Sequence, residues 1–250
     1  MSLWLWLAAP LIGLLLGLFG AGGGMLSVPL LIYGLGMPIK AAIATSLWIV
    51  AAVSLIAATQ QRAWRVLEPR LLGFFGLGGL AGGAIGAWIG TWINPVIQET
   101  LFAILLLLVG AWMSRQKLPG DNRDFICPCG LALMIGITLG IITGLLGVGG
   151  GFLMVPALLL LGISKMPVAI AHSLILISFN TIVSGTIYLE QVSLTSNTIL
   201  IIVILAGIGS FIGSLLLKAI PTQRLQQGFS LGLAVLGVAM LGKLALTALV

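Results

Sequence analysis

The chain contains the stretch Gly17-Leu-Phe-Gly-Ala-Gly-Gly-Gly-Met-Leu-Ser-Val-Pro29 and repeats it, with few changes, as Gly144-Leu-Leu-Gly-Val-Gly-Gly-Gly-Phe-Leu-Met-Val-Pro156. Over 15 positions from each first glycine, 10 residues are identical at a constant offset of 127. Other pairs match at the same offset, for example Ser46 with Ser173, Gly82 with Gly209, and Gly110 with Gly237. We therefore predict two homologous halves, residues 1–115 and 125–250, joined by a linker at residues 116–124.

The composition of the chain indicates an integral membrane protein. Hydrophobic residues make up 60% of the sequence and charged residues only 6%, whereas a soluble domain carries about 25% charged residues. Apolar runs of about 18 or more residues favour membrane helices over the alternating strands of a barrel, so we expect an all-α polytopic membrane protein. The net charge of +6 comes from basic residues in short loops, where they set topology, and we expect no nucleic-acid partner.

Two apolar runs are too long for a single crossing. Residues 1–39 and 125–164 carry no charge, and a helix of about 40 residues would be about 60 Å long, roughly twice the hydrocarbon thickness. Because each run contains a glycine triplet, we predict one break at Gly22–Gly24 and another at Gly149–Gly151. After each break we predict a short leg, a re-entrant or half-helix, at about residues 25–36 and 152–163. Three further spans would complete each half.

The positions of lysine and arginine predict how the halves are oriented. If each broken element returns to its starting side, nine of the 11 basic residues fall on one side and two on the other. If each element crosses once, the split is seven against four. The positive-inside rule favours the first arrangement. Equivalent loops of the two halves then have opposite charge bias, which predicts an inverted-topology repeat with both termini outside and the linker in the cytoplasm.

The paired breaks predict a binding site. Interrupted apolar segments at corresponding positions of two halves are typical of a transporter's substrate site. Three glycines let the backbone approach a ligand closely, and the unpaired N–H groups at the start of the next helix favour anions. We predict that two such helix starts converge on one anion, the alternative being that the glycines serve only helix packing. The predicted substrate-binding glycines are Gly22, Gly23, Gly24, Gly149, Gly150 and Gly151.

Polar residues in the next span of each half are further substrate-binding candidates. Thr45 and Ser46 occupy the places that His172 and Ser173 occupy in the second half. His172 is the only histidine, and an ionisable residue within a membrane segment indicates function. We predict that it contacts the ligand or couples a proton, the alternative being a hydrogen-bonded residue near a helix start. Asn180 shares a helix face with Ser173 and would contact the ligand or bond a neighbouring helix.

The doubled motif carries a family resemblance. The pattern Gly-x-x-Gly-x-Gly-Gly-Gly-x-x-x-Val-Pro, followed by Pro38 and Ala44-Thr45-Ser46-Leu47, resembles the TauE/SafE sulfite exporter family, also called the TSUP anion permeases. The second copy, which ends in Ala171-His172-Ser173-Leu174, fits as well. The resemblance covers essentially the whole chain. It implies transport of a small sulfur-containing anion, such as sulfite, thiosulfate or an organosulfonate, across the bacterial cell inner membrane.

Glycines and cysteines outside the breaks have simpler interpretations. A stripe of glycines at four-residue spacing predicts close packing between helices; its members are Gly78, Gly82, Gly86 and Gly90. The two cysteines, Cys127 and Cys129, fit the start of a helix, and a redox or sulfur-handling role is the alternative.

These features together predict a secondary transporter that works by alternating access, with export as the favoured direction. The alternatives are an organic-anion (carboxylate) permease and, with less support, a membrane-embedded enzyme or a scaffold subunit. The sequence shows no metal-ligand cluster, paired carboxylates or nucleophile–base arrangement, so we expect neither an enzyme nor a cofactor. The expected partners are the anion and the lipid bilayer, and a homodimer is a possible assembly. The coupling ion is left open by the sequence.

Overall fold

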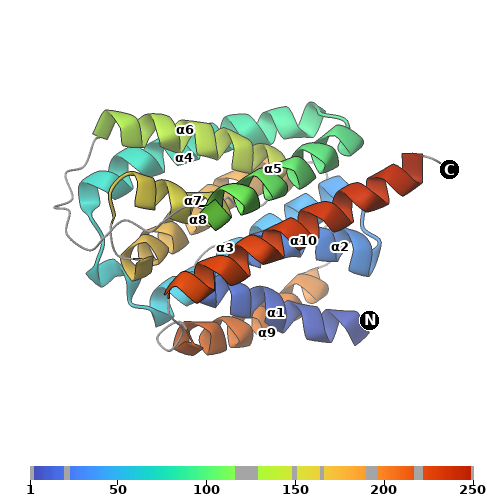
Figure 1. Ribbon diagram of the computed structural model, residues 1–250, viewed down its shortest axis with the longest axis horizontal. Coiled ribbons are helices and arrows are strands. Elements are labelled where there is room, and N and C mark those ends of the chain that lie inside the picture. The colour runs from blue at the N-terminus through green and yellow to red at the C-terminus, as the bar shows by residue number, and fades with distance from the viewer. Residues whose placement is uncertain are drawn as a thin grey trace.

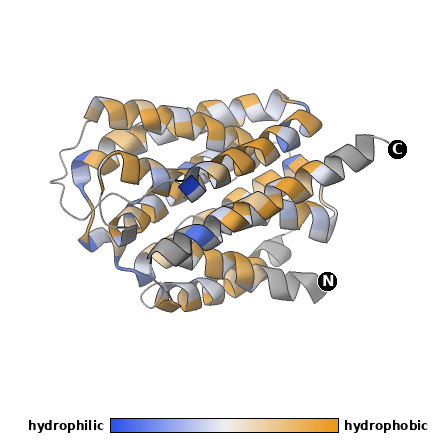
Figure 2. Cartoon of the chain, in the orientation of Figure 1, coloured by the Kyte–Doolittle hydropathy of each residue, from blue (hydrophilic) through white to orange (hydrophobic). Residues whose placement is uncertain are grey.

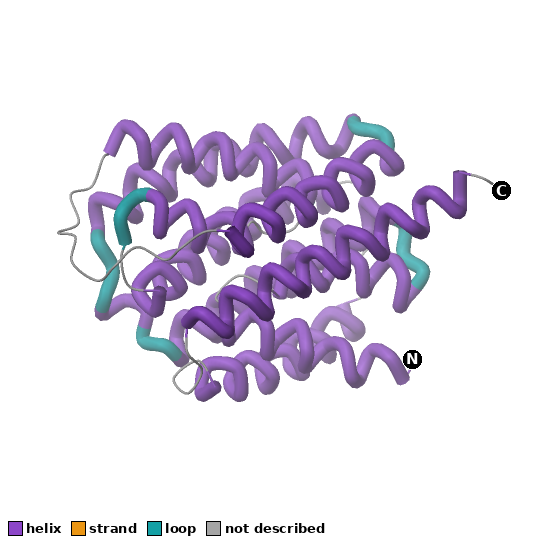
Figure 3. The backbone as a smooth tube through the Cα atoms, in the orientation of Figure 1, coloured by secondary structure: helices purple, strands orange, loops and turns teal. Residues whose placement is uncertain are grey.

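The computed structural model describes residues 3–19, 23–115, 129–147, 151–163, 166–189, 196–216 and 222–248. These ranges are almost entirely helical and contain no strand, and short loops join the helices (Figure 3). The predicted all-α class is confirmed. The elements are α1 (Leu3–Phe19), α2 (Gly23–Leu35), α3 (Ile39–Gln60), η1 (Ala63–Arg65), α4 (Pro69–Trp92), α5 (Pro95–Arg115), α6 (Cys129–Leu146), α7 (Gly151–Leu160), α8 (Met166–Leu189), α9 (Ser196–Leu216) and α10 (Thr222–Ala248).

The α-helices follow the order that the repeat predicts. A shift of 127 residues places α1 to α5 on α6 to α10. The short members are α2 and α7, with 13 and 10 residues, and each begins within or at the end of a glycine triplet. They begin at Gly23 and Gly151, earlier than the predicted legs. Glycine can occupy a first helical turn at a cost of about 1 kcal/mol relative to alanine, so part of each triplet belongs to the short helix that follows.

Five of the described helices are long and apolar enough to cross a membrane: α3, α4, most of α5, α6 and α8. Hydrophobic residues dominate these helices, while hydrophilic residues lie mainly near helix ends and in loops (Figure 2). α3 and α8 are mostly buried inside the protein, whereas only a third or slightly more of the residues in the apolar stretches of α4, α5 and α6 are buried. The chain is therefore a multi-pass membrane protein with α3 and α8 at its centre.

Each half packs mainly against the other half. α4 lies along α6 and α1 lies along α9, so the first helix of each half pairs with the fourth helix of the other. α3 packs on α8, α5 packs on α10, and α2 contacts α7, which are pairs of equivalent helices. Replacing each helix by its equivalent in the other half therefore gives this same set of contacting helix pairs.

Glycines bring the paired helices into backbone contact. A Cβ added at Gly78, Gly82 or Gly86 would lie 2.5, 2.2 or 2.1 Å from a carbonyl oxygen of α6, closer than side chains tolerate. The predicted packing role of these three glycines is thereby confirmed. α1 and α9 meet in the same way, because a Cβ at Gly17 would lie 2.3 Å from the carbonyl oxygen of Ser210.

The paired helices run parallel to each other. Gly13 lies against Ala206 and Gly17 lies against Ser210, so residue numbers increase in the same direction along α1 and α9. The contacts of α4 with α6 show the same order. The start of α1 and the end of α10 lie at one end of the helix bundle, while α5 ends and α6 begins at the opposite end (Figure 1).

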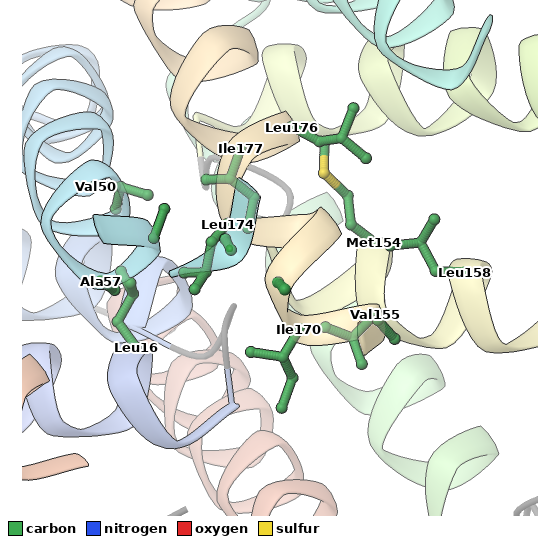
Figure 4. Packing of buried hydrophobic residues seen from close by; sticks show 14 of the residues in the cluster. Leu16, Val50, Ala57, Met154, Val155, Leu158, Ile170, Leu174, Leu176 and Ile177 are labelled. Atoms are coloured by element: carbon green, nitrogen blue, oxygen red, sulfur yellow. The ribbon is translucent and has the colours of Figure 1, made fainter. Parts of the chain in front are cut away.

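Buried apolar side chains from both halves meet around α8. Figure 4 shows Val50 of α3 on one side of Leu174 and Met154 of α7 on the other, and all three are fully buried. Close contact of such side chains stabilises helix association in lipid, where no hydrophobic force acts between helices. The half-helix α7 is thus fixed within the protein core.

Candidate functional site

The break in the second half starts where α6 ends. Gly147 has a φ of +68°, a conformation that favours glycine at the end of a helix, and its N–H donates to the Thr143 carbonyl at 2.9 Å. A Cβ at Gly147 would lie 2.0 Å from Cγ2 of Ile43. The central helix α3 of the first half therefore packs directly against the break of the second half.

Side chains from three helices bind the last carbonyl groups of α6. Such carbonyls have no partner within their own helix. The hydroxyl of Ser46 donates to the Gly147 carbonyl at 2.8 Å. The Leu145 carbonyl accepts from the Tyr188 hydroxyl at 3.1 Å and from the Gln98 amide. These bonds hold the end of α6 to α3, α8 and α5.

The end of α1 is held by one described side-chain bond. The Gln61 amide donates to the Gly17 carbonyl at 3.2 Å. Gln61 and Tyr188 are equivalent residues, since their numbers differ by the repeat offset of 127. The equivalent residues thus differ in type and bind carbonyls one position apart in the repeat, since Gly17 corresponds to Gly144 and not to Leu145.

Both half-helices begin at the glycine triplets. Gly23 and Gly24 form the start of α2, and Gly151 is the first residue of α7, while Gly22, Gly149 and Gly150 lie outside the described residues. The first N–H groups of a helix lack intrahelical acceptors and carry the positive end of the helix dipole. Because α2 and α7 contact each other, the structure brings together one such half-helix from each half.

Thr45 and Ser46 lie on α3 in different environments. Both are buried, with 3% and 0% of their surfaces exposed. The Ser46 hydroxyl donates a hydrogen bond to the Gly147 carbonyl. The Thr45 hydroxyl is buried and forms no hydrogen bond among the described residues.

His172 is fully buried and bonded through both ring nitrogens. Nδ1–H donates to the Val168 carbonyl at 2.8 Å, and Nε2 accepts the backbone N–H of Glu68 at 2.8 Å. This pairing requires the neutral ring with its proton on Nδ1. His172 therefore joins α8 to the residue that precedes α4, the arrangement expected of a hydrogen-bonded histidine near a helix start. Its predicted ligand contact or proton coupling stays a prediction.

Ser173 and Asn180 lie on α8 with helical partners. The Ser173 hydroxyl donates to the Ile170 carbonyl at 2.8 Å. The Asn180 amide donates to the Thr143 hydroxyl of α6 at 3.2 Å, and its Oδ1 would lie 1.9 Å from a Cβ at Gly83 of α4. Asn180 thus forms the interhelical bond that was one of its two predicted roles.

Sequence reasoning did not single out Tyr188, Gln98 or Gln61 as residues that bind helix ends. The available signal was the offset itself, which places two hydrogen-bonding side chains, Gln61 and Tyr188, at equivalent positions. Among the described residues, no group of three or more histidine, cysteine, aspartate or glutamate residues could hold a metal ion. Cys129 begins α6, and Cys127 lies outside the described ranges.

Comparisons with known proteins agree on a membrane transporter. Residues 5–240 match the family model described as Sulfite exporter TauE/SafE. A probable membrane transporter protein of Xylella fastidiosa (strain Temecula1) is 32% identical over 238 residues, which cover 92% of this chain and 90% of that protein. A probable membrane transporter protein of Methanocaldococcus jannaschii is 27% identical over 168 residues, covering 63% and 60%. No solved structure matches this chain.

Proposed function

The chain belongs to the sulfite exporter TauE/SafE family and is a membrane transporter, and we propose that it carries a small sulfur-containing anion out of the cell by alternating access. The proposed location is the bacterial cell inner membrane. The anion would be sulfite, thiosulfate or an organosulfonate, held between the two glycine breaks. The glycine triplets would supply backbone N–H groups, and Thr45 would add a hydroxyl.

One observation carries the binding part of this proposal. Two short helices, one from each half, begin at glycine triplets and contact each other. Unpaired N–H groups at helix starts bind oxyanions without a formal positive charge. A small anion has several oxygens that need donors, and an uncharged site also allows release.

The directions of two equivalent helices support an inverted repeat. α1 and α6 occupy equivalent places in the two halves. α1 begins at the end of the bundle where α10 ends, whereas α6 begins at the opposite end (Figure 1). Inverted halves that exchange conformations would open the site to one side of the membrane at a time.

The buried polar residues around the breaks would then have two roles, positioning the site and coupling a proton. Ser46 and Asn180 bond the C-terminal end of α6 from neighbouring helices and would position the site, and Ser173 would have the same role. His172, the candidate for proton coupling, links α8 to Glu68. If His172 also couples a proton, protonation of Nε2 would remove the acceptor of the Glu68 N–H and free that segment to move.

Flux into liposomes tests the proposal. The purified protein is reconstituted, and uptake of sulfite, thiosulfate, a sulfonate and acetate is measured separately, with empty liposomes as the control. We expect sulfur anions to move faster than acetate. Transport of acetate with no transport of any sulfur anion would establish a carboxylate permease instead, and reject the proposed substrate class.

A further inference from the structure

One turn of α3 carries two buried polar atoms that form no hydrogen bond among the described residues. They are Oγ1 of Thr45 and Nε1 of Trp48. Residues three apart in a helix lie on the same face, so both groups project from one side of α3. Thr45 is 3% exposed, and Trp48 is half-buried with its Nε1 fully covered.

This turn lies beside the break of the second half. Ser46, within the same turn, donates to the Gly147 carbonyl at 2.8 Å, and Ile43 contacts Gly147 directly. The indole nitrogen of Trp48 faces Gly185 on α8, where an added Cβ would lie 3.2 Å from Nε1. The glycine leaves room next to the indole N–H that any larger residue would reduce.

The chemistry of the two groups favours an anion. The indole N–H is a donor only, and the threonine hydroxyl can donate. A buried indole N–H usually has an acceptor, and an unmet donor inside a membrane protein is costly because no lipid group replaces water. An oxyanion oxygen would satisfy both donors, whereas a cation would leave the indole N–H without an acceptor.

The second half does not repeat this pair. The residue equivalent to Trp48 is Ile175, and the residue equivalent to Thr45 is His172, whose two nitrogens are already bonded. A donor pair of this kind is therefore a property of the first half.

We propose that the Trp48 indole N–H and the Thr45 hydroxyl form a donor pair that hydrogen-bonds an oxygen of the transported oxyanion. Trp48 is thereby a substrate-contacting residue that sequence reasoning missed. The inference rests on the proposed transport of an oxyanion, and it adds the Trp48 indole N–H to the Thr45 hydroxyl and the backbone donors of the breaks.

Flux measurements with Trp48→Phe test the contact. Phenylalanine keeps the aromatic ring and removes only the N–H, and a hydrogen bond to a charged group changes affinity by about tenfold or more. We expect the KM for sulfite to rise by at least about tenfold in Trp48→Phe and in Thr45→Val. Thr45→Ser, which keeps a hydroxyl, should retain most of the affinity. The matched control is Trp92→Phe, since Trp92 is 77% exposed and should leave KM unchanged.

Indole NMR on the wild-type protein tests the contact without relying on a variant. Protein labelled with ¹⁵N-tryptophan is titrated with sulfite, and the Trp48 signal is identified by its absence in Trp48→Phe. We expect that signal to move downfield and saturate, and not to move with equal concentrations of chloride.

The outcomes separate the two levels of the proposal. Saturable sulfite flux with an unmoved Trp48 signal and an unchanged KM in Trp48→Phe would overturn the donor pair and leave the transport function standing. Absence of wild-type flux for every sulfur anion would overturn the proposed function itself.

Discussion

Equivalent turns of the two central helices show how the halves differ. In α3, the buried hydroxyl of Thr45 forms no hydrogen bond among the described residues. In α8, the equivalent His172 uses both ring nitrogens to hold Val168 and Glu68. The repeat thus preserves the backbone arrangement while equivalent side chains differ. One half has a buried hydroxyl with no described hydrogen bond, and the other has a link between α8 and Glu68.

The ends of the first helices show the same difference. The end of α6 is held by Ser46, Tyr188 and Gln98, whereas the described bond at the end of α1 comes from Gln61. Among the described residues, three side chains thus donate at the end of α6 and one donates at the end of α1.

The largest expected effect comes from blocking either break. Gly23→Leu and Gly150→Leu place a bulky side chain where we propose that backbone N–H groups meet the anion. We expect sulfite flux in liposomes to be abolished by both, while the variants insert and purify like wild type. Flux at the wild-type rate in both variants would reject the converging helix starts, and loss in only one would show that a single half binds the anion.

Removal of a glycine contact between the halves should destabilise the protein. Gly82→Ala places a methyl group 2.2 Å from the Ile137 carbonyl oxygen, and overpacking of this kind costs about 1–3 kcal/mol. Gly73→Ala on the same helix meets nothing within 4 Å and is the control, expected to be neutral or to stabilise by up to about 1 kcal/mol. Unfolding in micelles, followed by helical circular dichroism, measures both. Equal stability of the two variants would contradict the backbone contact.

The link through His172 should be visible at a single amide. His172→Ala removes the acceptor of the Glu68 N–H, and loss of a buried hydrogen bond costs about 1–3 kcal/mol locally. We expect hydrogen exchange at the Glu68 amide to become at least about tenfold faster. Thr45→Ala is the matched variant in the first half and should leave that amide unchanged. An equal exchange rate of the Glu68 amide in wild type and in His172→Ala would contradict the structural role of His172.

The smallest effects should distinguish the two helix ends. Tyr188→Phe removes one donor to the Leu145 carbonyl, but the Gln98 amide still donates there, so we expect a loss of no more than about 1 kcal/mol. Gln61→Leu removes the described side-chain donor to the Gly17 carbonyl and should cost somewhat more, about 1–2 kcal/mol. Unfolding free energies of the two variants give the comparison, and the reverse order would contradict the role of the remaining Gln98 donor.

The breaks and the repeat were predictable from sequence because they follow from glycine positions, run lengths and a constant offset. The predicted starts of the two short helices, at about residues 25 and 152, are too late. The helices begin at Gly23 and Gly151, because glycine tolerates a first helical turn. The partners of the polar residues were not predictable. Ser46 bonds a carbonyl 101 residues away, and Nε2 of His172 accepts a backbone N–H from the residue that precedes α4, which no pattern of side chains reveals.

The parallel pairing of α1 with α9 has a consequence for biosynthesis. A ribosome completes α1, residues Leu3–Phe19, long before it makes α9, residues Ser196–Leu216. α1 must therefore keep its glycine face without its partner while α2 to α8 are made, whereas α6 emerges after its partner α4. The order of final assembly thus differs from the order of synthesis, because α1 can pair only after α9 has been made.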